Sequence, residues 1–367
     1  MIGLLELRRR KLQFGLIALV VTLVSYLVLM INGLGVGLNI QAGSVLRNFN
    51  ADGIAYSDNA GLSVIRSELS SEAVTAIADA DGGDRTAPLG YVAANYRRTS
   101  GVVKSAAFLG FVPGTIGEPD LVKGRILAAD DERALLADSR FLAVADLEVG
   151  DTVSVTVRLV TEEFVIVGEI DEGAFFFQPA VYVLLSTWQR LRYGESGDGQ
   201  PAASIVLVKG GDLVPGEGPG YKIVGKGTAF NNIEGVQGQQ STVQALRVFG
   251  FVIGGLVIAV FFYVITLQKV TQIGILKAVG ASSMFVFRQL VIQVLFVTSV
   301  AVAVSVLLAW ATALALRQLP DGVPIAFTTQ TYVLTVAGLF VVGLLATLIS
   351  GRQVLKVDPI IALGQQQ

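Results

Sequence analysis

Cysteine and histidine are both absent from the 367 residues of this chain. Without cysteine there is no disulfide framework and no cysteine nucleophile, and without either residue the usual zinc sites are excluded. Charge is also scarce, because Asp, Glu, Lys and Arg make up only 15% of the residues and the formal net charge is −2. This composition gives no sign of a nucleic-acid partner.

Four long apolar runs contain no Asp, Glu, Lys or Arg at all. Each is about long enough to cross roughly 30 Å of hydrocarbon as a helix, and one charge at a helix centre costs on the order of 3 kcal/mol on insertion scales. The sequence therefore predicts a membrane protein with four transmembrane helices in a 1+3 arrangement and a large α+β extracytoplasmic domain between helices 1 and 2. The runs are Leu12–Met30, Val248–Leu267, Leu290–Leu316 and Thr331–Ser350.

Basic residues gather at one set of helix ends, in Arg8–Lys11, in the connection after the second run and after the fourth run. The positive-inside rule then places both termini in the cytoplasm, in a multi-pass protein of the plasma membrane. The first run is too long for a signal peptide and no small-residue cleavage site follows it, so we expect an uncleaved anchor. We expect residues 1–42 to hold the N-terminus and helix 1, residues 43–244 the extracytoplasmic domain, and residues 245–367 helices 2–4 with a cytoplasmic coupling loop at 268–288.

The insert between the first two runs has both helical and strand patterns. Gly150-Asp151 is a turn signal, and Gly210–Gly220 is rich in Gly and Pro and predicts a loop. Helices are expected at Ser70–Ala80, Asp130–Ala137 and Phe141–Ala145, and strands at Asp151–Leu159, Phe164–Glu169 and Val181–Leu185.

Two short motifs in the insert have ordinary explanations. Gly220–Gly227 nearly fits a phosphate-binding loop, but Gly227 stands where that loop needs a Ser or Thr hydroxyl for Mg²⁺. We expect a turn at a strand edge there. The acidic run Asp130–Glu132 is expected to be a solvated helix start, not a metal site.

The segment Leu267–Gly280 reads LQKVTQIGILKAVG and lies between two apolar runs. Ile273, Ile275, Leu276 and Val279 are expected to share one helix face. The pattern fits a helical hairpin at the lipid interface and equally fits a coupling helix that docks on a cytoplasmic partner.

This segment resembles the cytoplasmic loop of ABC-transporter permeases of the FtsX and macrolide-exporter type, which often read Arg-x-x-Glu-Ile-Gly-Ile-x-Lys-Ala-x-Gly-Ala-Ser. The order of one span, a large domain and three spans is that family's layout, and Gly124-Arg125, Leu147–Val153 and Asp358-Pro359 also look like its landmarks. The sequence departs from the pattern at Gln272, where the family usually has Glu. Within the family, Phe261–Ala278 is most similar to the haem efflux permeases of Gram-positive bacteria.

The resemblance implies a non-enzymatic permease that works as a homodimer. Two copies of a separate ABC ATPase would bind the ATP and push on the coupling segment, so that the membrane helices carry the movement to the extracytoplasmic domain. Gly274 and Gly280 of this segment would allow close approach of the partner and a helix stop. The residues expected to dock the ATPase are Gln272, Ile273, Gly274, Ile275, Lys277, Gly280 and Lys356.

The resemblance also makes haem the leading cargo, with no intrinsic cofactor. Because His and Cys are absent, an axial ligand would have to be Tyr, Met or another oxygen or amine donor. Met30 could face the iron and Arg247 could pair with a propionate; the alternatives are that Met30 only packs and that Arg247 only extends its charge to the membrane surface. The candidate ligand-binding residues are Met30, Tyr56, Glu68, Glu234, Arg247 and Phe249.

Other functions stay open from the sequence. One is a permease that regulates an extracellular cell-wall hydrolase by mechanical transmission, although the insert lacks an evident long helical hairpin for such docking. Others are export of a lipid or glycolipid, a peptide or a drug, and lipoprotein release with a second, non-identical permease.

Overall fold

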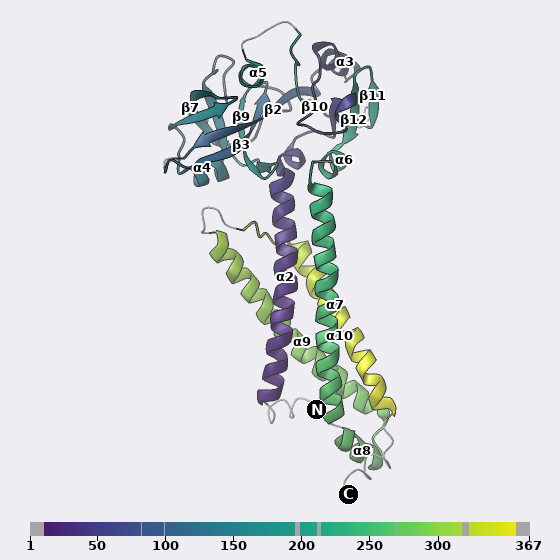
Figure 1. Ribbon diagram of the computed structural model, residues 1–367. Coiled ribbons are helices and arrows are strands. Elements are labelled where there is room, and N and C mark those ends of the chain that lie inside the picture. The colour runs from purple at the N-terminus through teal and green to yellow at the C-terminus, as the bar shows by residue number, and fades with distance from the viewer. Residues whose placement is uncertain are drawn as a thin grey trace. The chain divides into compact units, whose positions relative to one another are not determined.

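The computed structural model of this protein describes residues 11–81, 83–98, 100–194, 199–210, 214–268, 270–317 and 323–356 (Figure 1). The chain divides into two compact units. The helical unit comprises Met1–Gly37 and Ser241–Gln367, and the sheet unit comprises Leu38–Gln240. The sequence-based boundaries at residues 43 and 244 were drawn a few residues further along the chain.

The helical unit contains long apolar helices. Three of them, over Phe14–Asn48, Val236–Phe261 and Ser283–Leu316, are long and apolar enough to cross a membrane, and Thr329–Leu345 is a shorter apolar stretch within the described residues. The first three predicted runs lie in the three long helices and the fourth lies in the last helix. The helices are α2 (Lys11–Asn48), α7 (Val236–Gln268), α8 (Val270–Ala278), α9 (Ser283–Arg317) and α10 (Thr329–Lys356).

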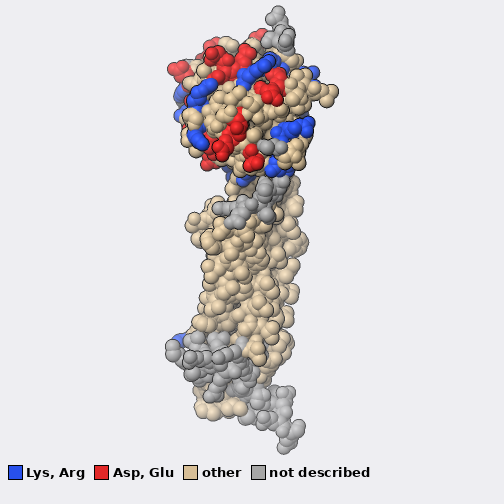
Figure 2. All heavy atoms as spheres, turned by 90° about the vertical axis from the view of Figure 1, so that its left-hand side faces the viewer, with Lys and Arg blue, Asp and Glu red and all other residues tan. Residues whose placement is uncertain are grey.

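Apolar side chains hold the long helices together. In one cluster Ile17 and Val21 of α2 pack with Ile258 of α7 and Val297 of α9. A second cluster brings α2, α9 and α10 together around Leu339. Many other apolar side chains of these helices are exposed, and on the face shown in Figure 2 the helices carry almost no charge. A helix that is apolar all round is the form expected in a lipid environment.

The sheet unit is built on one 12-stranded mixed sheet with the order β11-β12-β1-β10-β2-β3-β9-β5-β7-β4, while β6 pairs with β2 and β7, and β8 pairs with β9. The pairs β3–β9 and β5–β7 are parallel and the others are antiparallel. Charged side chains gather on this unit (Figure 2). The strands are β1 (Gly53–Ser57), β2 (Thr86–Arg97), β3 (Val103–Phe111), β4 (Leu121–Gly124), β5 (Ala134–Asp138), β6 (Thr152–Val157), β7 (Val160–Ile170), β8 (Ala174–Phe175), β9 (Gln178–Leu184), β10 (Ile205–Val208), β11 (Gly216–Gly218) and β12 (Tyr221–Gly225).

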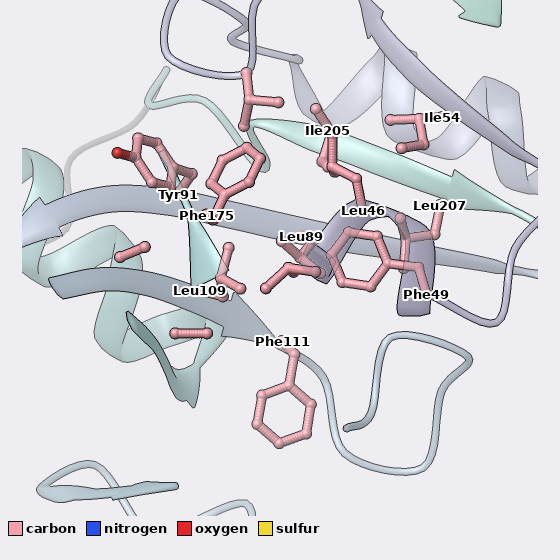
Figure 3. Close-up of a cluster of buried hydrophobic side chains, with 14 of the residues drawn as sticks. Leu46, Phe49, Ile54, Leu89, Tyr91, Leu109, Phe111, Phe175, Ile205 and Leu207 are labelled. Atoms are coloured by element: carbon pink, nitrogen blue, oxygen red, sulfur yellow. The ribbon is translucent and has the colours of Figure 1, made fainter. Parts of the chain in front are cut away.

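Short helices flank this sheet, and apolar clusters fill the space beneath them. In the larger cluster Leu46 and Phe49, from the end of α2, lie among strand residues such as Leu89 and Leu207 (Figure 3). The buried Trp188 of α5 lies so close to the backbone that a Cβ added at Gly90 would be 2.0 Å from its ring. The helices are η1 (Asp58–Ala60), α3 (Ser71–Asp81), α4 (Ser139–Ala145), α5 (Leu185–Tyr193) and α6 (Lys226–Asn231).

Most of the expected elements of the sheet unit are confirmed, and one is wrong. The helix expected over Asp130–Ala137 is a turn followed by β5, whose five residues are all buried. A short continuous apolar run in a central strand looks the same in sequence as a buried helical segment. Gly150 has a positive φ of 108°, as the turn signal indicated, and the predicted loop Gly210–Gly220 also contains the short strand β11.

The end of α2 is tied to the sheet unit by the segment Glu172–Phe177, which we call the α2 clamp. At Gly43 the backbone leaves helical geometry, with φ −176° and ψ 45°. The N–H groups of Phe177 and Phe176 donate to the carbonyl oxygens of Gln41 and Ala42, at 2.8 and 3.0 Å. Backbone groups that the break frees are thus satisfied by the clamp. Two side chains add to it: the Ala174 N–H donates to Ser44 Oγ at 2.8 Å and Asn48 Nδ2 donates to the Glu172 carbonyl at 3.1 Å.

Candidate functional site

The predicted coupling segment forms α8 and a tight turn into α9. Gly280 has a positive φ of 101°. The Gly280 N–H donates to the Lys277 carbonyl at 3.0 Å, and the Ala281 N–H donates to the Leu276 carbonyl at 2.9 Å. This pattern is a Schellman helix end, which favours glycine at the left-handed position. The helix stop expected at Gly280 is therefore present, and Ser282 Oγ accepts the Phe285 N–H at 3.2 Å at the start of α9.

The apolar residues of α8 do not share one face, contrary to the expectation. Ile273 is buried against Val286 of α9. Ile275 and Leu276 are exposed, and Val279 is 83% exposed. At about 100° per residue, Ile273 stands well apart from Ile275 and Val279 around the helix axis. The hairpin therefore holds itself together through Ile273 and presents an apolar knob formed by Ile275, Leu276, Val279, Met284 and Phe285.

The remaining docking candidates occupy the same hairpin or the end of α10. Gly274 is buried in α8, and Lys277 lies in its last turn with a half-buried side chain. The backbone of Gln272 lies in α8 and that of Lys356 ends α10, but the side chains of both lie outside the described residues. No partner chain tests these assignments, so docking at these seven residues stays a prediction.

Three of the cargo candidates lie on the antiparallel pair of α2 and α7. A Cβ added at Gly250 would lie 3.3 Å from Val28 and 3.9 Å from Ile31, and one added at Gly254 would lie 3.0 Å from Val24. From Gly250 to Gly254 along α7 the contacts move backwards along α2, from Val28 to Val24, because the two helices are antiparallel. Met30 of α2 therefore stands at about the level of Arg247 and Phe249 of α7.

The Arg247 side chain has few partners. It is half-buried, its Nη1 donates only a long 3.5 Å bond to Gln244 Oε1, and its Nε is buried without a hydrogen-bond partner in the described part of the chain. Phe249 is 63% exposed and Met30 is half-buried. A guanidinium with donors to spare suits the anionic part of an amphipathic ligand. The exposed ring of Phe249, two residues along α7, lies on a different side of the helix.

The other three cargo candidates lie in the sheet unit, where two of them interact. Tyr56 is fully buried in β1 and its hydroxyl has no partner among the described residues. Burial raises the pKa of this phenol well above its usual range, and the negative charge of Glu234 adds to the increase. Burial and then Glu234 also raise the pKa of Tyr91 to about 12. Glu234 itself is 3.7 Å from Arg66 Nη2, and its Oε2 is buried without a hydrogen-bond partner in the described structure.

Glu68 belongs to a different cluster. Its Oε1 accepts from Arg192 Nη2 at 3.0 Å and from the Tyr193 hydroxyl at 3.2 Å. These two hydrogen bonds give the exposed Glu68 carboxylate a structural role that does not involve a ligand. The described residues contain no group of three or more Asp, Glu, His or Cys side chains that could hold a metal ion.

The segment Gly220–Gly227, which nearly fits a phosphate-binding loop, contains β12 and the start of α6, and its lysine has a structural role. Lys226 Nζ donates to the carbonyl oxygens of Phe49 and Arg47, at 2.8 and 3.2 Å. A cation bonded to the last carbonyl groups of a helix stabilises the helix end. In the acidic run, Asp131 accepts two bonds from the Arg125 guanidinium, so it is a surface ion pair rather than a metal site.

Sequence reasoning missed two features that carry chemistry. Asn32 Nδ2 of α2 donates to Thr335 Oγ1 of α10 at 2.9 Å, and both side chains are buried. The available signal was polar residues in or next to apolar runs, because Thr335 lies inside the fourth run and Asn32 lies two residues after the first. The second feature is a cavity of about 600 Å³ in the sheet unit, bordered by the buried Glu172. No local motif marks it, because its lining comes from segments far apart in the sequence.

Comparison with known proteins supplies the family. Residues 245–359 match the family model described as FtsX-like permease C-terminal. The chain is 28% identical over 367 residues to a putative hemin transport system permease protein HrtB of Staphylococcus haemolyticus, a match that covers 98% of this chain and 97% of the relative. It is 24% identical over 362 residues to an uncharacterized ABC transporter permease of Mycobacterium tuberculosis, covering 97% and 96% of the two chains.

Two solved structures are also similar in part. The extracellular domain of the ABC-type transporter YknZ is 15% identical, with a TM-score of 0.32, over 45% of this chain and 85% of that one. The periplasmic region of MacB from Actinobacillus actinomycetemcomitans is 16% identical, with a TM-score of 0.34, over 50% and 94%. The family model and the full-length relatives confirm the resemblance drawn from the sequence: the chain carries an FtsX-like permease domain and is an ABC-type permease.

Proposed function

We propose that this permease is the membrane subunit of an efflux pump for an amphipathic molecule, with haem as the leading cargo. It works as a homodimer with two copies of a separate ATPase. Full-length similarity to a putative hemin transport permease supports this choice of cargo. Haem is here the substrate, not a resident cofactor.

The proposed topology has four membrane crossings, with both termini in the cytoplasm and the sheet unit outside. The three long apolar helices and the apolar stretch of α10 support the crossings. The basic residues in and around α8 and in the last turns of α10 support the orientation, since such residues favour the cytoplasmic side. In this topology the α8 hairpin faces the cytoplasm.

The exposed apolar knob of the α8 hairpin supports its assignment as the ATPase docking surface. Exposed apolar residues at a turn between two membrane helices are typical of a surface that a partner covers. Closure of the ATPase dimer on ATP would push this hairpin, and α9 would move with it because Ile273 is packed against Val286. Such a push selects between two states of the permease.

The observation that carries the haem proposal is that Arg247 and Phe249 of α7 stand at about the same level as Met30 of α2. Arg247 supplies spare donors for a propionate, and Met30 supplies a thioether for the iron. The exposed ring of Phe249 lies on another side of α7 and stays a candidate contact for the macrocycle. Tyr56 and Glu234 are alternatives, but Tyr56 is fully buried in the sheet unit and Glu234 is half-buried there beside Arg66.

Haem binding to the purified full chain in detergent tests the proposal. Wild-type permease should shift the Soret band of added haem, and Arg247→Ala should weaken binding about tenfold, the effect of losing one charge-assisted hydrogen bond of about 1.5 kcal/mol. Arg97→Ala, which removes an exposed arginine of the sheet unit, is the matched control and should bind as wild type. Equal binding by Arg247→Ala and wild type would refute this site.

A further inference from the structure

The cavity in the sheet unit is a second place where this protein can hold a ligand. Its volume of about 600 Å³ lies in the range of small-molecule sites. Residues far apart in the chain line it: the end of α2 with the link to β1, the β3–β4 loop, the clamp residue Glu172, Tyr182 of β9, and the lysines Lys209 and Lys226. It belongs entirely to the sheet unit, so it is distinct from the cargo residues on α2 and α7.

Glu172 is the unusual member of this lining. Its side chain is only 7% exposed. One carboxylate oxygen, Oε1, accepts the Asp120 N–H at 3.2 Å, while the other, Oε2, is buried and has no hydrogen-bond partner in the described part of the chain. An unsatisfied buried carboxylate oxygen costs on the order of several kcal/mol if it is charged. A structural role alone does not account for leaving it unpaired.

The charges around Glu172 favour a cation. The lining holds four carboxylates, Asp52, Glu118, Asp120 and Glu172, against two lysines. Lys226 already donates to two carbonyl oxygens at the end of α2, and Lys209 is exposed. Beyond the lining, Asp138 and Asp171 also act on Glu172, and Tyr182 of β9 borders the same space. No cation within the described residues pairs with Glu172.

Burial raises the pKa of Glu172 to about 7. The carboxylates of Asp120, Asp138 and Asp171 contribute to this increase, and the hydrogen bond from the Asp120 N–H opposes it. A carboxyl group that desolvation and neighbouring negative charge hold near neutral pH is stabilised in its charged form by an incoming cation. Perturbed groups of this kind in a cavity are typical of functional sites.

We propose that this cavity binds a small ligand that carries an ammonium group, and that the Glu172 carboxylate pairs with that group. Binding requires Glu172 to turn its carboxyl toward the cavity that it borders. Because the Glu172 carbonyl accepts from Asn48 near the end of α2, the ligand would sit against the α2 clamp. The site is independent of the haem proposal.

Calorimetric titration of spermidine into the full chain in phosphatidylcholine nanodiscs tests this proposal. Between pH 6 and pH 8 the charged fraction of Glu172 rises from about one tenth to about nine tenths, so affinity should rise about tenfold, with proton release at pH 6. Glu172→Gln should lose this pH dependence and bind at least tenfold more weakly at pH 8. Glu163→Gln, on the exposed side of β7, is the matched control and should behave as wild type.

Three outcomes would overturn the proposal: no measurable spermidine binding, equal affinity at the two pH values, or unchanged binding by Glu172→Gln. Haem binding by the same preparations distinguishes the two proposals. Glu172→Gln should leave the Soret titration unchanged, and Arg247→Ala should leave the spermidine titration unchanged.

Discussion

The substitution Glu172→Gln should change how the stability of the sheet unit depends on pH. Glutamine keeps the size of the side chain and removes its titration. In the folded protein the pKa of Glu172 is about 7, against an ordinary value of 4.5. A rise of this size costs the folded state about 3 kcal/mol once the group is charged in both states.

The direction follows from proton binding. Well below pH 4.5 Glu172 is protonated in both the folded and unfolded chain, and it contributes nothing. Between pH 4.5 and 7 the folded chain binds more protons than the unfolded chain, so stability falls as pH rises. Between pH 5 and pH 8 the wild type should therefore lose about 2.5 kcal/mol that Glu172→Gln does not lose. Asp138, whose pKa burial raises to about 6, contributes in the same direction in both proteins.

Tryptophan fluorescence during urea unfolding measures this difference. The chain has two tryptophans, so a Trp310→Phe background leaves Trp188, fully buried in the sheet unit, as the single reporter. The free energy of unfolding is compared at pH 5 and pH 8 with and without Glu172→Gln, and Glu163→Gln is the control. An identical pH dependence with and without Glu172→Gln would refute the burial argument.

Three further substitutions test the fold and the hairpin. Val279→Asp, on the exposed knob, should change the unfolding free energy by less than about 0.5 kcal/mol but abolish co-purification of the cognate ATPase. The control Val160→Asp, on the exposed part of β7, should still co-purify with the ATPase. Co-purification retained by Val279→Asp would show that the knob is not part of the interface. Lys226→Met should lower the unfolding free energy reported by Trp188 by about 2 kcal/mol, because two charge-assisted hydrogen bonds to the end of α2 are lost. Lys222→Met, which removes only an exposed ion pair with Glu217, should cost under about 0.5 kcal/mol. Equal losses by the two variants would contradict the role of Lys226. Gly255→Ala should destabilise the helical unit by about 1–3 kcal/mol in a thermal melt, because the new Cβ would lie 2.6 Å from Val342, while Gly15→Ala meets nothing within 4 Å and should not destabilise.

The sequence predicted best the features that follow from one residue type or one period. Uncharged runs identified the apolar helices, Gly280 identified the end of α8, and alternating residues identified β6 and β7. It failed at Asp130–Ala137, because a fully buried strand loses the alternation that distinguishes it from a helix. Local pattern is a weak guide wherever both faces are covered.

The candidate sites were predictable only in part. The position of the coupling hairpin follows from the chain, but the burial of Ile273 against Val286 depends on how α8 folds back on α9. The shared level of Met30 and Arg247 depends on the register of α2 and α7, which small residues such as Gly250 allow and which the sequence does not reveal. The Glu172 cavity is formed by strand order, so only the structure brings its lining together.

Haem-dependent ATP hydrolysis tests the proposed export function most directly. The full chain is reconstituted in liposomes with its cognate ATPase, and hydrolysis is measured with and without haem for wild type and Arg247→Ala. Haem should stimulate hydrolysis by the wild-type complex, and Arg247→Ala should need about tenfold more haem for the same stimulation. A rate of hydrolysis that haem leaves unchanged and that another hydrophobic compound increases would contradict the assignment of haem as the cargo.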